Sequence, residues 1–112
     1  MGNDPPVSQD AKGPIALSEI VQYQPGAVVS RTIVKKPSGT VTAFAFDQGE
    51  GLSEHTAAYD ALAIVIEGEP DISIAGVRHR VPAGNLLRLP AGRPHAVKAL
   101  TRFKMLLVMI RD

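Results

Sequence analysis

The stretch "GNLLRLPAGRPH", residues 84–95, shows the pattern that decides the fold. Its "NLLRL" segment is short and mostly apolar, as expected of a β-strand, and the following "PAGRP" has the proline and glycine of a tight turn. A histidine, His95, comes directly after this turn. The stretch therefore predicts a short strand, a turn and a second segment that begins with an imidazole.

The same pattern continues toward both ends of the chain. "VVSRTIV" and "TVTAFAF" flank a "KKPSG" turn, and "DISI" and "VRHRV" flank Ala75-Gly76, which suits a two-residue hairpin turn. "ALAIVI" and the closing "FKMLLVMI" are continuous apolar runs, which are typical of strands buried on both faces. Short strands separated by turns every eight to twelve residues or so predict an all-β sandwich or small barrel.

Length and composition predict one folded domain. The 112 residues are 45% hydrophobic but only 4% aromatic, so aliphatic side chains must fill the core. A chain of this size buries roughly two-thirds of its surface, which leaves a thin stability margin. We expect residues 1–14, which are polar and proline-rich, to form a flexible tail, and residues 15–112 to form the domain. Residues 15–23 fit either one helical turn or an extended lead-in.

Charge and composition exclude several classes of partner. The net charge is +1, and the densest basic stretch, "RTIVKKPSG", lacks the interleaved aromatic residues of a single-strand binding surface. The chain has no cysteine, so disulfides and thiolate ligands are excluded. It shows no secretory signal and no apolar run long enough for a membrane span. We therefore expect no nucleic-acid or membrane partner and a cytoplasmic location.

Two histidine segments resemble the motifs of the cupins, a family of small jelly-roll barrels. The family's second motif reads Gly, five residues, Pro-x-Gly, two residues, His, three residues, Asn. Gly84, Pro90, Gly92 and His95 all fall on this spacing, and Ala99 replaces the Asn.

The family's first motif is only partly kept. It reads Gly, five residues, His-x-His, three or four residues, Glu, six residues, Gly. Gly49, His55 and Gly68 match it, whereas Ala57 replaces the second His and Ala61 replaces the Glu.

The resemblance covers about residues 28–112 and implies a single-domain jelly-roll barrel, also called a double-stranded β-helix. In cupins the motif histidines project into the barrel and, with the second His and the Glu, bind a divalent metal. A catalytic metal usually needs three protein ligands and an open position, and this chain offers only His55 and His95. The resemblance thus implies at most a weakly held Fe, Ni, Zn or Mn ion.

Nearby carboxylates do not obviously complete a metal site. Asp60 and Glu54 each neighbour a ligand position, and adjacent strand residues point to opposite faces. Glu67 has the inward parity but lies about 20 Å along the strand from the usual position of the Glu, at ~3.3 Å per residue.

Small side chains replace the missing ligands. We expect Ala57, Ala61 and Ala63 to line one inward face, with Val65 beyond them. Methyl groups around two histidines describe a mostly apolar cavity with two polar anchors, which is the usual form of a small-molecule site. The candidate ligand-binding residues are therefore His55, Ala57, Ala61, Ala63 and His95.

Three functions remain open from the sequence. The first is a binding module that holds a small organic molecule through His55 and His95. The second is a metal-dependent cupin enzyme, of the dioxygenase or isomerase type, with the same histidines as ligands. The third is metal-free acid–base catalysis by one histidine, which lacks a visible orienting carboxylate. Whether the protein is an enzyme stays open.

Two further expectations concern packing. His79 lies in "VRHRV", paired across the hairpin with the face that bears Ile72 and Ile74, and we interpret it as a partly exposed structural residue. The closing strand is apolar on both faces, which a lone small barrel cannot easily cover. We therefore expect a homodimer, formed by sheet packing or by exchange of N-terminal strands such as "VVSRTIV".

Overall fold

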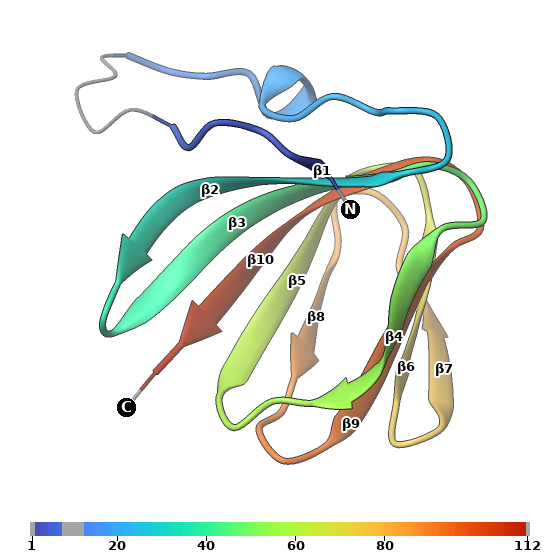
Figure 1. The fold of residues 1–112 in the computed structure, drawn as a ribbon. Helices are drawn as coiled ribbons and strands as arrows, with labels where there is room; N and C mark the ends of the chain where they lie inside the picture. The colour runs from blue at the N-terminus through green and yellow to red at the C-terminus, as the bar shows by residue number, and fades with distance from the viewer. Residues whose placement is uncertain (1, 8–12, 112) are drawn as a thin grey trace.

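The computed structural model describes residues 2–7 and 13–111, which form two β-sheets that face each other (Figure 1). The larger sheet contains, in spatial order, β1 (Gly2–Asn3), β2 (Val28–Lys36), β3 (Gly39–Phe46), β10 (Phe103–Ile110), β5 (Asp60–Glu67) and β8 (Leu86–Leu89). The smaller sheet contains β4 (Gly51–Thr56), β9 (Pro94–Ala99), β6 (Pro70–Ile74) and β7 (Val77–Arg80). From β3 onward the chain passes repeatedly from one sheet to the other, as in a jelly roll. The predicted all-β jelly-roll fold is confirmed.

The turns follow from local chemistry. Residues 37 and 38 join β2 to β3, inside the predicted "KKPSG" turn. Ala75 (φ 49°) and Gly76 (φ 82°) join β6 to β7, and two successive positive φ values match the type I′ turns of two-residue hairpins. A short 3₁₀ helix, η1 (Leu17–Glu19), precedes β2. No helix in residues 2–7 and 13–111 is long and apolar enough to cross a membrane.

The main core lies between the two sheets. Alternate residues of each strand face inward, as the strand period of two requires. Phe46 and Phe103 stack at its centre with ring centroids 4.4 Å apart. The other buried members of this core are Val28, Ala61, Ala63, Val65, Ile72, Val81, Leu89, Val97, Ala99 and Met105. The predicted inward face of the last strand is confirmed, because Phe103 and Met105 belong to this core and Leu107 and Met109 pack against it.

A second, smaller core covers part of the outer face of the larger sheet. Ile20 and Val21, from the segment that precedes β2, pack with Val29, Ala43 and Ala45, whose side chains point away from the barrel interior. Figure 1 shows this segment lying across the sheet on the side away from β4. The apolar outer face is therefore partly covered by the chain's own N-terminal residues.

A buried lysine fastens this segment to β10. The Nζ atom of Lys104, a residue with only 4% of its surface exposed, donates a 2.6 Å hydrogen bond to the carbonyl oxygen of Ser18. The same Nζ lies 4.8 Å from the centroid of the Tyr23 ring, and the Tyr23 hydroxyl donates a 2.8 Å bond to Glu67. Polar contacts thus compensate for a cation placed on an otherwise apolar strand.

The first residues of the chain lie at the edge of β2. Gly2–Asn3 pair with β2 in parallel, and the amides of Asp4 and Val7 donate to the carbonyl oxygens of Ser30 and Thr32. This part of the predicted tail is thus held at the sheet edge. Residues 1 and 8–12 of that tail lie outside the described residues.

Candidate functional site

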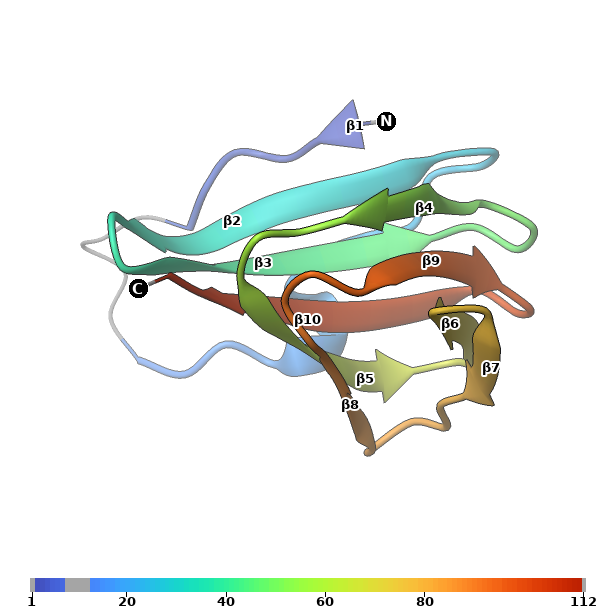
Figure 2. The same ribbon diagram turned by 90° about the horizontal axis from the view of Figure 1, so that it is seen from below.

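The structure brings His55 and His95 together. They are directly opposite each other on β4 and β9, with ring centroids 4.3 Å apart and ring planes at 69°. His55 is near the end of β4 and His95 near the start of β9, so the pair lies at the end of the barrel where β4 leads into β5 and β8 into β9. Figure 2 shows the molecule from this end. Residues forty positions apart in the sequence therefore form one imidazole pair.

A β-bulge in β4 turns His55 toward the inner face. Leu52 is opposite Val97, and the next paired residues are His55 and His95, so two residues of β4 face only Ala96 on β9. Strict alternation from the inward-facing Leu52 would have pointed His55 outward. The extra residue reverses the parity, as bulges commonly do beside functional sites.

The two rings have different environments. His95 has 6% of its surface exposed, whereas His55 is exposed to solvent. Burial, and secondly the neighbouring His55, lower the pKa of His95 below its usual 6.5, while the backbone of Arg93 acts in the opposite direction. The environment of His95 therefore favours the neutral form of its ring. Both rings were expected to lie in an apolar cavity, but the structure buries only His95.

The hydrogen bonds of the pair determine what it offers to a ligand. The Nδ1 atom of His55 lies 3.0 Å from the carbonyl oxygen of Ser53. A carbonyl oxygen only accepts, so Nδ1 carries the proton in the neutral ring and Nε2 remains an acceptor. The Nδ1 atom of His95 is buried and has no hydrogen-bond partner among the described residues. The pair thus offers one oriented acceptor and one buried nitrogen that lacks a partner.

The inward face that Ala57, Ala61 and Ala63 were predicted to line forms only in part. Ala61 (3% exposed) and Ala63 (0%) lie in the inner core on β5, next to Val65, as expected. Ala57 does not join them, because β4 ends at Thr56 and Ala57 lies in the connection to β5. It is half-buried, and its carbonyl oxygen accepts a 2.9 Å bond from the amide of Gly92. Ala57 therefore links the two motif segments and does not line the inward face with Ala61 and Ala63.

The carboxylates near the motifs do not complete a metal site. Asp60 forms an ion pair with Arg88 at 3.3 Å and accepts a 2.8 Å bond from the amide of Ala91, which is the main reason that its pKa is lowered. Glu54 is exposed. No group of three or more His, Cys, Asp or Glu side chains able to hold a metal occurs in residues 2–7 and 13–111. The residues present do not fit the three-ligand set of a catalytic metal.

The inward parity predicted for Glu67 is wrong. Lys104 pairs with Glu67 but the adjacent Met105 pairs with Val65, so β5 has a bulge at Ile66. This extra residue turns Glu67 to the outer face, where it binds Tyr23.

Ile74 and His79 share the inner face of the smaller sheet with the imidazole pair. Ile74 is directly opposite His95 on β6 and is partly buried against the inner core. His79 is opposite Ile72, as predicted, and is half-buried. The three histidines of the chain therefore share the inner face of the smaller sheet. The register of the Ala75-Gly76 hairpin is the sequence signal for His79, whereas the position of Ile74 opposite His95 depends on the pairing of β6 with β9.

Comparison with known proteins identifies the family. Residues 43–111 match the model of the cupin domain, and the chain belongs to the cupins. A conserved protein of unknown function from Streptococcus pyogenes is 30% identical, with a TM-score of 0.87 over 92% of this chain and 90% of that one. A cupin superfamily protein from Desulfitobacterium hafniense is 25% identical, with a TM-score of 0.86 over 91% and 94%.

A third solved structure is more similar in sequence but longer. It is a cupin 2 conserved barrel domain protein from Leptotrichia buccalis, 40% identical, with a TM-score of 0.81 over 84% of this chain and 46% of that one. No curated protein matches the sequence.

Proposed function

We propose that this cupin binds a small organic molecule at the end of its barrel, anchored by the pair of His55 and His95. The observation that carries the proposal is the imidazole pair itself, with ring centroids 4.3 Å apart and one of the two rings, His55, exposed to solvent. An exposed imidazole beside a buried one supports a ligand site, because the exposed ring can supply a polar contact at the end of the barrel.

The chemistry of the pair defines the ligand. The Nε2 atom of His55 is an acceptor, so the ligand presents a hydroxyl or N–H donor to it. Ile74, Leu107 and Met109 are partly buried against the inner core and favour an apolar body. A small, weakly acidic or neutral molecule with one donor group meets both conditions.

A metal-dependent enzyme of the dioxygenase or isomerase type is the alternative. The cupin family supports it, but His55 and His95 alone would leave most coordination positions to water, and such a site would hold Fe, Ni, Zn or Mn weakly. No catalytic step is assigned to this chain through a metal.

A binding experiment with a metal control separates these functions. Protein purified without an affinity tag is screened by thermal shift against small hydroxylated and weakly acidic compounds, with and without a chelator, and its metal content is measured. We expect binding that the chelator leaves unchanged and that weakens about tenfold or more in the His55→Ala/His95→Ala double variant. His79→Ala is the matched control and retains binding.

Two results would reject the binding proposal. Ligand binding that survives in the double variant would mean that the histidines are not the anchors. About one equivalent of bound metal, lost in the double variant together with ligand binding, would favour the metal-dependent alternative.

We also propose that the protein is a homodimer. Strand alternation places Val34, Leu86 and Ile110 on the outer face of the larger sheet, where they are 42%, 59% and 54% exposed. Exposed apolar side chains on one face favour a contact between copies. Light scattering should give twice the 11.9 kDa mass of the chain, and Leu86→Asp should halve it. A wild-type monomer at all concentrations tested would contradict the proposal.

A further inference from the structure

A second hollow lies on the outer face of the smaller sheet, away from the histidine pair. It has a volume of about 340 Å³ and is lined by Asp71, Ser73, Arg78, Ala96, Val97 and Lys98. Ile72 and Ile74 of β6 face the barrel interior, so their neighbours Asp71 and Ser73 point outward. The hollow is therefore distinct from the site proposed above.

Side-chain size explains the hollow. Ser73 is directly opposite Ala96 on β9 and opposite Arg78 on β7. The serine and the alanine form a low floor, whereas Arg78 and Lys98 are long side chains beside it. A small ligand can therefore lie on the sheet between two cations.

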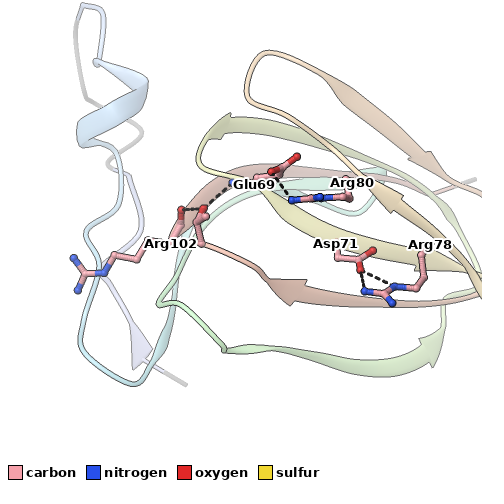
Figure 3. A network of polar contacts seen from close by, with 6 residues as sticks. Glu69, Asp71, Arg78, Arg80 and Arg102 are labelled. Carbon is pink, nitrogen blue, oxygen red and sulfur yellow. Dashed lines mark hydrogen bonds and ion pairs between the residues drawn. The ribbon is translucent and has the colours of Figure 1, made fainter.

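Asp71 holds one of these cations in place. It is a buried residue (7% exposed), and Nε and Nη2 of Arg78 both donate to its Oδ2, with Nε at 2.7 Å. Figure 3 shows the Arg78 side chain beside Asp71, with Arg80 and Glu69 forming a neighbouring pair. The contact orients the guanidinium and leaves its Nη1 hydrogens available.

The second carboxylate oxygen of Asp71, Oδ1, is buried and has no hydrogen-bond partner among the described residues. A buried acceptor without a partner carries its full desolvation cost, so a ligand that brings a donor into the hollow would relieve it.

The charge balance around the hollow favours an anion. Arg78 is paired with Asp71, and Arg80 is paired with Glu69 at 3.2 Å. Lys98 is exposed and belongs to none of the ion pairs found in the described part of the chain. One ammonium group that belongs to none of these ion pairs, that of Lys98 on β9, therefore lines the hollow across β6 from Arg78 on β7.

We propose that this hollow binds a small carboxylate that carries a hydroxyl or amino group next to its carboxyl carbon. The carboxylate lies between Arg78 and Lys98, and the Ser73 hydroxyl donates to it. The neighbouring hydroxyl or amino group donates toward Asp71, and the small carbon body rests on Ala96. Binding at this hollow is separate from the binding proposed at His55 and His95.

An NMR titration tests the proposal with three probes: glycolate, acetate and inorganic phosphate. We expect saturable shifts of the amides of Ser73, Arg78 and Lys98 with glycolate, and binding about threefold or more weaker for acetate, which lacks the donor. Tighter binding of phosphate than of glycolate would overturn the assignment to a carboxylate, and the absence of saturable shifts would overturn the site.

Variants separate a specific site from a general effect of charge. Ser73→Leu fills the floor without changing any charge and should weaken glycolate binding by about tenfold or more. Arg88→Ala, which removes a cation paired at 3.3 Å on the other sheet, is the matched control and should bind normally. Ser73→Leu is the decisive variant, because Arg78→Ala leaves Asp71 buried without its cation and endangers the fold.

The double variant of the histidine pair keeps the two proposals distinguishable. His55→Ala/His95→Ala should retain glycolate binding at the hollow. Loss of glycolate binding in that variant, or unchanged binding in Ser73→Leu, would show that the hollow is not the site.

Discussion

Replacing Gly68 with alanine tests whether the connection between β5 and β6 packs as closely against the start of β10 as the structure shows. Gly68 lies between β5 and β6 with a φ of 73°. A Cβ atom at this position would be 1.9 Å from the carbonyl oxygen of Arg102 and 2.7 Å from the Cα of Phe103. These are backbone atoms, so relief requires moving Phe103, which is fully buried and stacked on Phe46.

Two costs add in this variant. The positive φ costs an alanine about 1–2 kcal/mol. Forcing extra volume against a packed core costs typically about 1–3 kcal/mol more. We therefore expect Gly68→Ala to lower the free energy of unfolding by about 2–5 kcal/mol, a large share of the roughly 5–15 kcal/mol available to a domain of this kind.

Gly84→Ala is the matched control. Gly84 has a φ of 84°, but an added Cβ there would meet nothing within 4 Å. Only the conformational cost remains, about 1–2 kcal/mol.

Urea denaturation followed by circular dichroism measures both variants. With an m-value of about 1–3 kcal/mol per M, the extra cost in Gly68→Ala lowers the midpoint by roughly 1 M relative to Gly84→Ala. Equal midpoints for the two variants would refute the close backbone approach at Gly68.

Three further predictions concern the turn, the acid range and the buried imidazole. Ala75→Asn should raise the free energy of unfolding by about 0.5–1 kcal/mol, because asparagine tolerates the φ of 49° better than alanine, as thermal denaturation would show. A hydrogen bond from Arg102, and secondly one from the amide of Gly26, lower the pKa of Asp47 from 3.8 to about 2. Its stabilising effect is therefore complete above pH 3.8 and lost as the pH falls through about 2, and Asp47→Asn should remove this dependence from the melting temperature. The lowered pKa of His95 means that the unfolded chain binds the proton more readily, so stability should fall as the pH drops below 6.5, and less so in His95→Gln.

Each of these has a result that would contradict it. A lower melting temperature for Ala75→Asn would argue against the type I′ turn. Parallel pH curves for Asp47→Asn and the wild type between pH 4 and 2 would show that the Arg102 pair is not stabilising. Identical curves for His95→Gln and the wild type between pH 7 and 5 would show that His95 is not buried as described.

Much of the fold follows from local sequence. Alternating and continuous apolar segments predicted the strands, and "FKMLLVMI" coincides with β10 (Phe103–Ile110). The Ala75-Gly76 turn followed from its position between two strand segments, and it placed His79 opposite Ile72. These features depend on neighbouring residues and on a strand period of two, so the amino-acid order alone is enough to predict them.

The candidate site depends on contacts between distant segments. Strand alternation alone would have pointed His55 outward, because it does not foresee the bulge in β4, and the bulge in β5 made the parity prediction for Glu67 wrong. A bulge depends on how two strands pair and not on one strand's pattern. The exposure of His55, the burial of Lys104 under the N-terminal segment and the unpaired Oδ1 of Asp71 likewise arise only when remote residues meet. Local chemistry specifies the strands and turns, whereas the register and packing between them determine which side chains face a ligand.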